Sequence, residues 1–556
     1  MPTIDEYLRK GPTQKAEKKR RGRKPKRHAE KKAPKVETEL TPEFENRLWK
    51  VADKLRKKME VHQYKYVVLG LIFLRALSYS FYERREELKK LMSDPSSELY
   101  IPDQDLRERM LEDEDFYLSG GALYIPVEAR WDYLVKNASQ PNIAELIDNA
   151  IEVLENKYPD RLKNVIPKIY TQSPLDHHDY TYLINKFSEI DFGYDHKAKD
   201  IFGRIYEYFL GKFTEVEGKL GGKFYTPRSL TRLIVEVLDV KGGTILDPAC
   251  GSGGFFVSAL EKLERDGIDP LTLSIHGQDS DPMAYRLTKM NLLIRGAEGD
   301  IRIGDSYHDD KFAGMTFDYV VANPPFNDSE WGADRIRPDD PRLRLGGKRL
   351  PVPPNNNANY MWILHFIHHT APTGKAGFVM ANGALTGGRV EGEIRKAIIE
   401  NDLIYGIVAA PQKLFYNVSL PVSLWFIRKE KPKHMKGKVL FINAKDLYVQ
   451  VSRRQNVMTD EHIKKVVDKF KLFEEGRLDE IDETGFAKVA TIEEIAANGY
   501  ALTPGRYVGV KLEFDDRRTF DEKMREYSEE LGKLLREEEE LTGKIREVME
   551  ALGWKI

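Results

Sequence analysis

The residues with the clearest chemical potential are Asn323-Pro324-Pro325-Phe326, which follow the apolar segment 318–322. Such a segment indicates a buried parallel strand, with the four residues in the loop at its carboxyl end. The Asn323 side-chain oxygen and the Pro324 carbonyl can both accept hydrogen bonds from an amino group. Acceptors so placed favour the nucleophilic, pyramidal form of a planar amine, and Phe326 offers a ring face to a flat base. The loop predicts methyl transfer to a planar amino nitrogen; the alternative is an ordinary proline-rich turn.

A glycine turn lies earlier in the chain, between an apolar strand at 244–246 and an apolar helix start. Its glycines allow positive φ and close approach of a ligand, and no Gly-Lys-Ser/Thr follows to bind a triphosphate. The next strand ends at Asp279, which can hold ribose hydroxyls. A further short strand leads to Asp305 and Ser306, which are placed to meet an adenine edge. The cofactor contacts predicted in the turn are Asp247, Ala249, Gly251, Ser252, Gly253 and Gly254.

In this order, the segments resemble S-adenosylmethionine-dependent methyltransferases that act on N6 of adenine in DNA. In that family, the segment that corresponds to 222–227 packs against the methionine part of the cofactor. The resemblance implies S-adenosylmethionine as cofactor and Asp279 as the ribose-binding acid, where Glu is frequent. It adds as cofactor contacts Lys223, Phe224, Tyr225, Thr226, Pro227 and Arg228.

The resemblance extends over roughly residues 45–510 to the modification (M) subunit of type I restriction-modification systems. The segments that carry it are 277–279, 289–292, 357–360, 391–395, 414–417, 498–500 and 504–508. It implies double-stranded DNA as substrate, base flipping, and a separate specificity (S) subunit. A second M subunit and a motor-nuclease (R) subunit are further partners of that family. The catalytic loop alone would also serve cytosine N4, an RNA guanine or a protein glutamine, and a stand-alone enzyme or a scaffold without turnover stays open.

Alternating strands and helices predict an α/β fold, a doubly wound, mostly parallel Rossmann-like sheet with a helical N-terminal domain and a long C-terminal helix. The expected strands are 244–246, 273–276, 301–303, 319–322, 377–380, 405–409 and 422–427. The expected domains are a basic disordered tail at 1–40, a helical domain at 41–170, the methyltransferase domain at 171–445, a small helical or irregular extension at 446–514, and a subunit-contacting helix at 515–556.

Two basic stretches are candidate DNA contacts. The tail contains Arg21, Arg23 and Lys24, for which a solvated tail is the alternative. The long polar segment 327–357 is expected to be a mobile flap over DNA; the alternative is a flexible surface insertion. Its candidate contacts are Arg335, Arg337, Arg342, Arg344, Lys348 and Arg349.

Composition narrows the remaining possibilities. The net charge is −1 and there is one cysteine, Cys250, which excludes a disulfide framework and fits a reducing cytoplasm. The sequence contains no run of about 18 apolar residues, so no membrane span is predicted. No metal site is expected, and the pairs His177-His178 and His368-His369 are interpreted as surface or capping residues. An apolar stripe from 520 to 552 predicts a helix that docks on another subunit or folds back.

Overall fold

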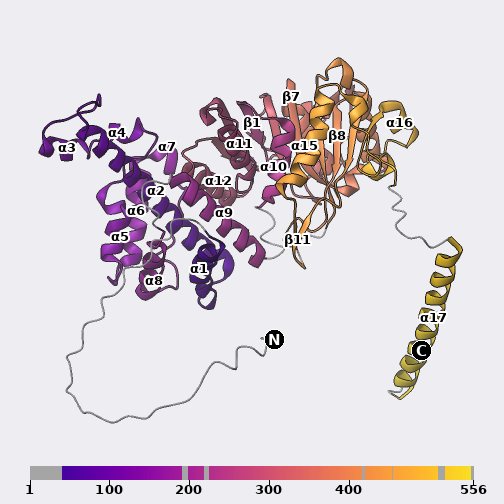
Figure 1. Cartoon of the computed structure of the whole chain (residues 1–556), viewed down its shortest axis with the longest axis horizontal. Coiled ribbons are helices and arrows are strands. Elements are labelled where there is room, and N and C mark those ends of the chain that lie inside the picture. Colours follow the sequence, from indigo (N-terminus) through magenta and orange to yellow (C-terminus); the bar gives the residue numbers. More distant parts are fainter. Residues whose placement is uncertain are drawn as a thin grey trace, which may run out of the picture.

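The computed structural model describes residues 41–190, 198–217, 225–415, 420–453, 455–510 and 520–551. The predicted tail contacts Arg21, Arg23 and Lys24, and the predicted cofactor contacts Lys223 and Phe224, lie outside these residues. In Figure 1, the N-terminal helices form one end of the molecule and the sheet the other, with α9 to α12 between them.

The N-terminal region is helical, as predicted, and is built around the long helix α2, Val61–Ser93. Aromatic and aliphatic side chains from α2 and from α9, Ala198–Glu217, form a shared core that also takes in one face of α12, Pro282–Ile294. The other helices of this region are α1 Pro42–Asp53, α3 Gln104–Met110, α4 Asp115–Leu118, α5 Trp131–Asn137, α6 Ile143–Lys157, α7 Pro159–Leu162 and α8 His177–Phe187. By length and composition α2 could cross a membrane, but 78% of its most apolar window is buried inside the protein, as in the core helix of a soluble protein.

A nine-stranded sheet forms the second half, with strand order β13-β10-β8-β9-β7-β4-β1-β2-β3. Neighbours from β3 through β7 run parallel, and β9 runs antiparallel to both β7 and β8. This confirms the predicted doubly wound sheet with an antiparallel end. The strands are β1 Gly243–Asp247, β2 Leu273–Asp279, β3 Asp300–Ile303, β4 Phe317–Ala322, β7 Thr370–Ala381, β8 Ile404–Ala409, β9 Val422–Arg428, β10 Lys438–Asn443 and β13 Ala487–Thr491.

Helices cover both faces of the sheet, because alternate strand residues point to opposite sides. Ile245 of β1 belongs to a core shared with α10 (Arg228–Leu238), α11 (Gly254–Arg265) and α15 (Asp460–Glu474). The next residue, Leu246, belongs to a core shared with α13 (Asn359–His369), α14 (Arg389–Glu400) and α16 (Ile492–Ala497).

Of the predicted helical or irregular extension at 446–514, residues 446–453 and 455–510 are described, and they contain strands as well as helices. Strand β13 pairs antiparallel with β10 and so completes the main sheet. A separate hairpin is formed by β11, Val449–Ser452, and β12, Gln455–Val457. The expected boundary at residue 445 therefore does not separate this region from the sheet.

The C-terminal helix α17 spans Phe520–Ala551, within the predicted helical tail. Its apolar stripe is exposed along the helix, with Tyr527 60% and Leu531 58% accessible. The other exposed members are Met524, Leu534, Leu535, Leu541 and Ile545.

Candidate active site

The predicted site residues converge at one edge of the sheet. Asp247 and Asp279 end β1 and β2, Asp305 follows β3, and Asn323 follows β4. These strands are mutually parallel, so their carboxyl ends meet at one edge. Parallel sheets bind their ligands at this edge.

The Asn323 side-chain amide has a hydrogen-bond partner on its nitrogen and none on its oxygen. Its Nδ2 donates to the Thr226 hydroxyl over 3.0 Å. Its Oδ1 is buried and has no hydrogen-bond partner. A buried acceptor left unpaired costs about 1–3 kcal/mol. An amino group entering beside Asn323 would supply the missing donor.

The Phe326 ring is half-buried and packs against the core on one sheet face. Phe415, in the connection between β8 and β9, meets it edge-on with ring centroids 6.1 Å apart and planes at 88°. Edge-to-face packing fixes a ring orientation and contributes about 0.5–1.5 kcal/mol. Pro324 is buried and Pro325 exposed, so the loop is anchored through its first proline.

The glycine turn is braced from inside by buried Asp247, whose carboxylate accepts from Ala249 N–H at 3.0 Å. Burial raises the pKa of Asp247 well above its usual range. Gly251 and Gly253 adopt positive φ of 55° and 78°, and a Cβ on Gly253 would meet the Thr288 methyl at 3.1 Å. Glycine is thus required where the chain turns into α11.

Asp279 holds the same turn from the next strand. One carboxylate oxygen accepts from Gly251 N–H at 2.9 Å and the other from Asp281 N–H at 3.0 Å. Burial raises the pKa of Asp279, although these backbone hydrogen bonds oppose the rise. Each carboxylate oxygen has a second lone pair, which leaves acceptors for ribose hydroxyls.

Two residues of α12 complete the turn and were not singled out as site residues from the sequence. Thr288 donates from its hydroxyl to the Gly251 carbonyl at 2.9 Å, and Asn291 donates from Nδ2 to the Ser252 carbonyl at 2.8 Å. The segment 289–292 did resemble the family, but no spacing rule gives the role of its Asn.

Beyond β3, Asp305 and Ser306 also contact protein groups. Ser306 Oγ donates to the Pro248 carbonyl at 2.6 Å, which joins the ends of β1 and β3. Asp305 accepts from Tyr307 N–H and pairs with His308 Nδ1 at 2.7 Å. His308 Nε2 lies 2.9 Å from the Gly332 carbonyl, so the loop after β3 is tied to the polar segment that follows Phe326.

The polar segment 327–357 packs against the sheet domain, so it is not the long irregular loop that its polar sequence suggested, and the expected mobile flap over DNA stays a prediction. It contains two short 3-10 turns, Ala333–Arg335 and Pro341–Leu343, and a hairpin of β5 Arg344–Leu345 and β6 Lys348–Arg349. Its apolar side chains are buried in the core of the sheet domain: Trp331, Ile336, Leu343 and Leu350. Just after Phe326, Asn327 has a positive φ of 53°, and its backbone N–H and side chain both bond the Asn359 side chain at the start of α13.

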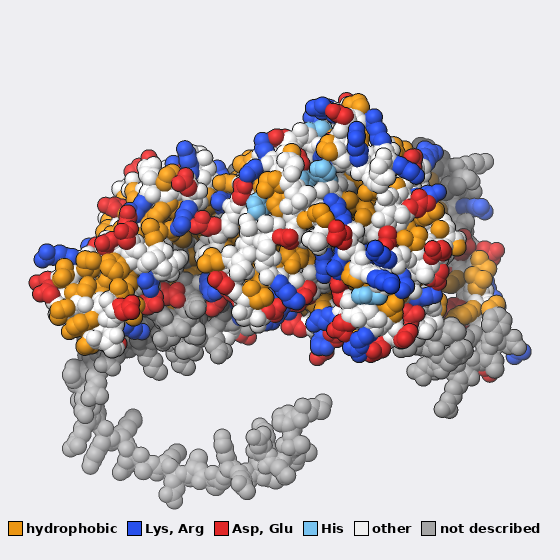
Figure 2. All heavy atoms as spheres, turned by 90° about the horizontal axis from the view of Figure 1, so that it is seen from above, with side chains coloured by type: hydrophobic (Ala, Val, Ile, Leu, Met, Phe, Trp, Pro, Cys, Tyr) orange, Lys and Arg blue, Asp and Glu red, His pale blue; other side chains and the backbone are white. Residues whose placement is uncertain are grey.

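The prediction that Arg342 contacts DNA is wrong. It is buried and pairs with Asp340 through two nitrogens, and it donates to the carbonyls of Ser306 and Tyr307 at 2.9 and 2.7 Å. Its guanidinium is committed to holding the loop after β3 and cannot meet phosphates. The other predicted cations of this segment are exposed: Arg335, Arg337, Arg344, Lys348 and Arg349. Acidic and basic side chains are intermixed on the face shown in Figure 2.

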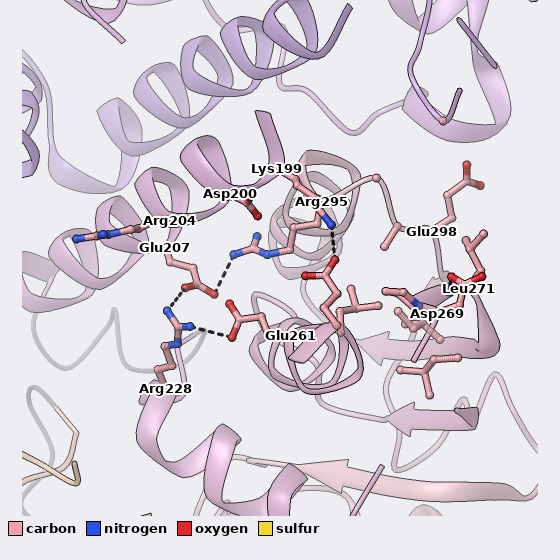
Figure 3. Close-up of a pocket in the computed structure, with 18 residues that line it drawn as sticks. Lys199, Asp200, Arg204, Glu207, Arg228, Glu261, Asp269, Leu271, Arg295 and Glu298 are labelled. Carbon is pink, nitrogen blue, oxygen red and sulfur yellow. Dashed lines mark hydrogen bonds and ion pairs between the residues drawn. The ribbon is translucent and has the colours of Figure 1, made fainter. Parts of the chain in front are cut away.

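A cavity of about 670 Å³ lies away from this edge, between α9 and the helices α10, α11 and α12 (Figure 3). Arg228, a predicted cofactor contact, faces it and pairs with Glu261 at 2.8 Å and Glu207 at 3.3 Å. Arg295 pairs with Glu207 at 3.1 Å. A smaller cavity of about 20 Å³ adjoins the glycine turn and is lined in part by Tyr225, Thr226, Ser252, Gly254 and Asn291.

These residues fit an adenosyl cofactor beside an amine. The turn offers two backbone positions with positive φ, the carboxylate of Asp279 keeps free lone pairs, and the unpaired Oδ1 of Asn323 lies at the next strand end. S-adenosylmethionine bound at this edge would supply an electrophilic methyl group.

The strand order and the two helical layers define a doubly wound methyltransferase fold, shared with a solved methyltransferase subunit. The family model described as N-6 DNA Methylase matches residues 197–516, and the HsdM N-terminal domain model matches residues 44–187. The chain belongs to the type I restriction enzyme methylase subunits, within the N6 DNA methyltransferase family.

Individual relatives agree along nearly the whole chain. The type I restriction enzyme MjaIX methylase subunit of Methanocaldococcus jannaschii is 78% identical, over 93% of this chain and 92% of the relative. The HindI methylase subunit of Haemophilus influenzae is 36% identical, over 78% of this chain and 100% of the relative. A type I methyltransferase subunit from Streptococcus thermophilus superposes with a TM-score of 0.67 and 26% identity, over 84% of this chain and 99% of that structure.

Proposed function

We propose that this subunit transfers a methyl group from S-adenosylmethionine to N6 of an adenine flipped out of double-stranded DNA. One observation carries the proposal: Asn323 presents a buried, unpaired Oδ1 beside the glycine turn. Asn323 Oδ1 and the Pro324 carbonyl would accept from the amine and hold its lone pair toward the methyl group. Phe326 would support the base, and Asp279 the ribose of the cofactor.

The same residues explain why no covalent enzyme intermediate is needed. The nitrogen attacks the methyl carbon, the carbon–sulfur bond breaks with its electrons going to sulfur, and the amine then loses a proton to water. The protein contributes position and acceptors, which raise the rate by fixing the reacting geometry.

Partner subunits complete the proposal. No helicase Walker motif or metal-nuclease signature occurs in the sequence, so DNA cleavage and ATP hydrolysis are assigned to other subunits. We place base-sequence choice in a separate specificity subunit, with the exposed stripe of α17 as a helix-docking surface. We place the complex in the cytoplasm.

Product analysis tests this function. The chain is incubated with methyl-labelled S-adenosylmethionine and DNA, alone and with the specificity subunit encoded beside it, and the digested bases are identified by mass. N6-methyladenine formed only with the specificity subunit is the expected result. Methylcytosine, or a labelled protein or RNA, would replace the assigned substrate. Site-specific transfer by the chain alone would identify a self-sufficient enzyme.

The variant Asn323→Ala distinguishes methyl transfer from the alternative function as a scaffold. Loss of methylation with retained complex assembly supports an enzyme whose amide acts on the amine. Unchanged methylation by the variant would refute the assigned role of Asn323, and absence of methylation by the wild-type complex under all conditions would favour a scaffold.

A further inference from the structure

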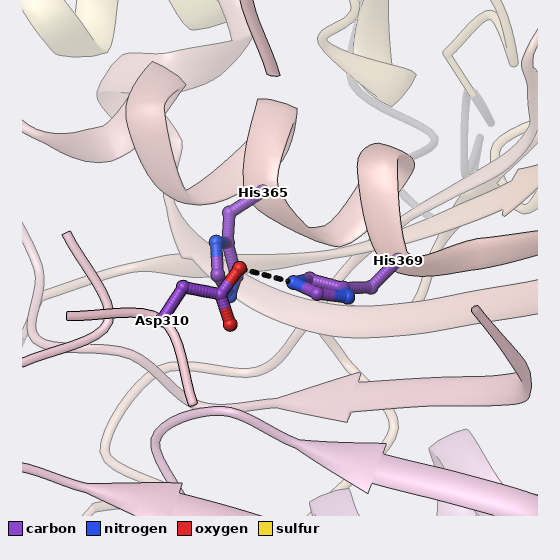
Figure 4. A group of neighbouring side chains, drawn as sticks. All are labelled: Asp310, His365 and His369. Carbon is purple, nitrogen blue, oxygen red and sulfur yellow. Dashed lines mark hydrogen bonds and ion pairs between the residues drawn. The ribbon is translucent and has the colours of Figure 1, made fainter. Parts of the chain in front are cut away.

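A buried cluster of two histidines and an aspartate lies outside the methyl-transfer site. His365 and His369 are one turn apart on α13 and face Asp310 in the connection between β3 and β4 (Figure 4). His369 is fully buried and His365 is 2% exposed. The prediction that His369 is a surface or capping residue is therefore wrong, and no spacing in the sequence groups these three residues.

The donor atoms of the cluster point toward one another. One ligand atom from each residue lies within 4.8 Å of the other two. His369 Nε2 is 2.9 Å from Asp310 Oδ2, and its Nδ1 is 2.8 Å from the Met315 carbonyl. A carbonyl on the far nitrogen is the usual partner of a metal-binding imidazole, because it fixes the tautomer and aims the other nitrogen.

His365 is the member that an ion pair between Asp310 and His369 does not explain. Its Nε2 is buried and has no partner.

We propose that Asp310, His365 and His369 bind a divalent transition-metal ion, with zinc the best match. Two imidazoles and one carboxylate suit zinc, whereas magnesium and calcium prefer oxygen ligands alone. Water would complete four-coordination. The three proposed ligands are distinct from the residues assigned to methyl transfer, and Arg342 links the two groups by contacting both His365 and the Ser306 carbonyl.

Metal binding would change which nitrogens of His369 and His365 carry a proton. The metal replaces the proton held between His369 Nε2 and Asp310, so one proton is released. Arg342 approaches His365 Nδ1 at 3.3 Å, which is long for a hydrogen bond. Metal binding at His365 Nε2 would leave the ring proton on Nδ1, so the contact from Arg342 to Nδ1 would be lost, whereas Arg342 would keep its bonds to Asp340 and to the carbonyls of Ser306 and Tyr307.

Metal titration of the full chain, without a histidine tag and after chelator treatment and dialysis, tests the site. Zn²⁺ is titrated by calorimetry, and Co²⁺ is titrated by its visible absorption, which reports four-coordination. The wild type should bind one equivalent and unfold at a higher temperature with Zn²⁺, because a ligand that binds only the folded state stabilises it.

The matched variants are His365→Asn, which retains an acceptor near the Nδ1 position but lacks Nε2, and His368→Asn on the same helix. His365→Asn should weaken Zn²⁺ binding by more than about 100-fold, since losing an outer partner alone costs about 10–100-fold. His368→Asn should bind within about twofold of wild type. His365→Gln serves as a second variant if circular dichroism shows His365→Asn to be unfolded. Absence of wild-type binding, equal binding by the His365 variants, or loss of binding on replacing the surface pair His177 and His178 would overturn the proposal.

Discussion

The glycine turn and the catalytic loop lie at the same edge of the sheet, yet they are held in opposite ways. The turn is clasped on several sides: Gly251 and Ser252 offer carbonyls that α12 binds, and Asp279 binds the Gly251 N–H. In the loop, the Asn323 side-chain nitrogen has a hydrogen-bond partner, whereas the buried side-chain oxygen has none. On the proposed function, the turn would hold the cofactor, whereas the loop would keep one acceptor for the incoming amine.

The largest effect should come from removing the open acceptor. Asn323→Ala should lower kcat for methyl transfer by about 100–1,000-fold, the range found when one catalytic hydrogen-bonding group is deleted. S-adenosylmethionine affinity, measured by calorimetry, should stay within about threefold. The control is Asn401→Ala, which removes an exposed amide on α14's C-terminal side. A large loss of cofactor affinity in Asn323→Ala would remove the contrast between loop and turn.

The next effect should come from loosening the turn. Asn291→Leu leaves the Ser252 carbonyl without its donor, at a cost of about 1–3 kcal/mol. The Kd for S-adenosylmethionine should rise by about 5–150-fold, while kcat at saturating cofactor changes little. A thermal unfolding scan accompanies the titration, because Asn291 also bonds Arg295. An unchanged Kd in a folded variant would show that the turn does not need this clasp.

A smaller effect is expected where the loop is held. Thr226→Val removes the partner of Asn323 Nδ2 and should lower kcat by about fivefold, in line with about 1 kcal/mol for one hydrogen bond. Thr226→Ser should restore the rate. The resemblance assigns Thr226 to the cofactor, so the Kd for the cofactor distinguishes that role from positioning Asn323. A rise in Kd without a fall in kcat would show that Thr226 acts on the cofactor and not through Asn323.

The smallest effect should follow Phe415→Leu, which keeps apolar volume but removes the ring edge against Phe326. Because leucine keeps apolar contact, we expect a loss near the lower end of about 0.5–1.5 kcal/mol, which corresponds to a fall of about twofold in kcat/KM for DNA. Single-turnover rates with saturating DNA separate base placement from DNA binding. Equal values for the variant and wild type would show that Phe326 needs no lateral support.

Strand ends were the most predictable part of the molecule. Apolar runs followed by Asp247, Asp279 and Asn323 gave the strands and, through parallel pairing, the edge at which they meet. Strands β10 and β13 were missed: β10 carries a short apolar run at 439–442 beyond the last expected strand, whereas β13 is an edge strand of mixed polarity without a clear period. The segment 327–357 was misjudged because its few buried apolar residues are separated by long polar stretches.

Contacts between distant parts of the chain were beyond prediction. Thr226 and Asn323 are 97 residues apart, and Asp310 and His369 are 59 apart. Nothing in either local sequence signals these pairs, because the fold alone brings them together. The burial of Arg342 shows the same limit, since its residue type and its neighbours suggested a surface cation.

The lone thiol of the chain has a practical consequence. Cys250 is the single cysteine in the sequence, and it is 4% exposed within the braced turn. Burial also raises the pKa of Cys250 well above its usual range, which suppresses the reactive thiolate. A cysteine placed at exposed Lys348 could therefore be coupled to a fluorophore with little background labelling. The hairpin of β5 and β6 would then report in real time when nucleic acid reaches this side of the enzyme.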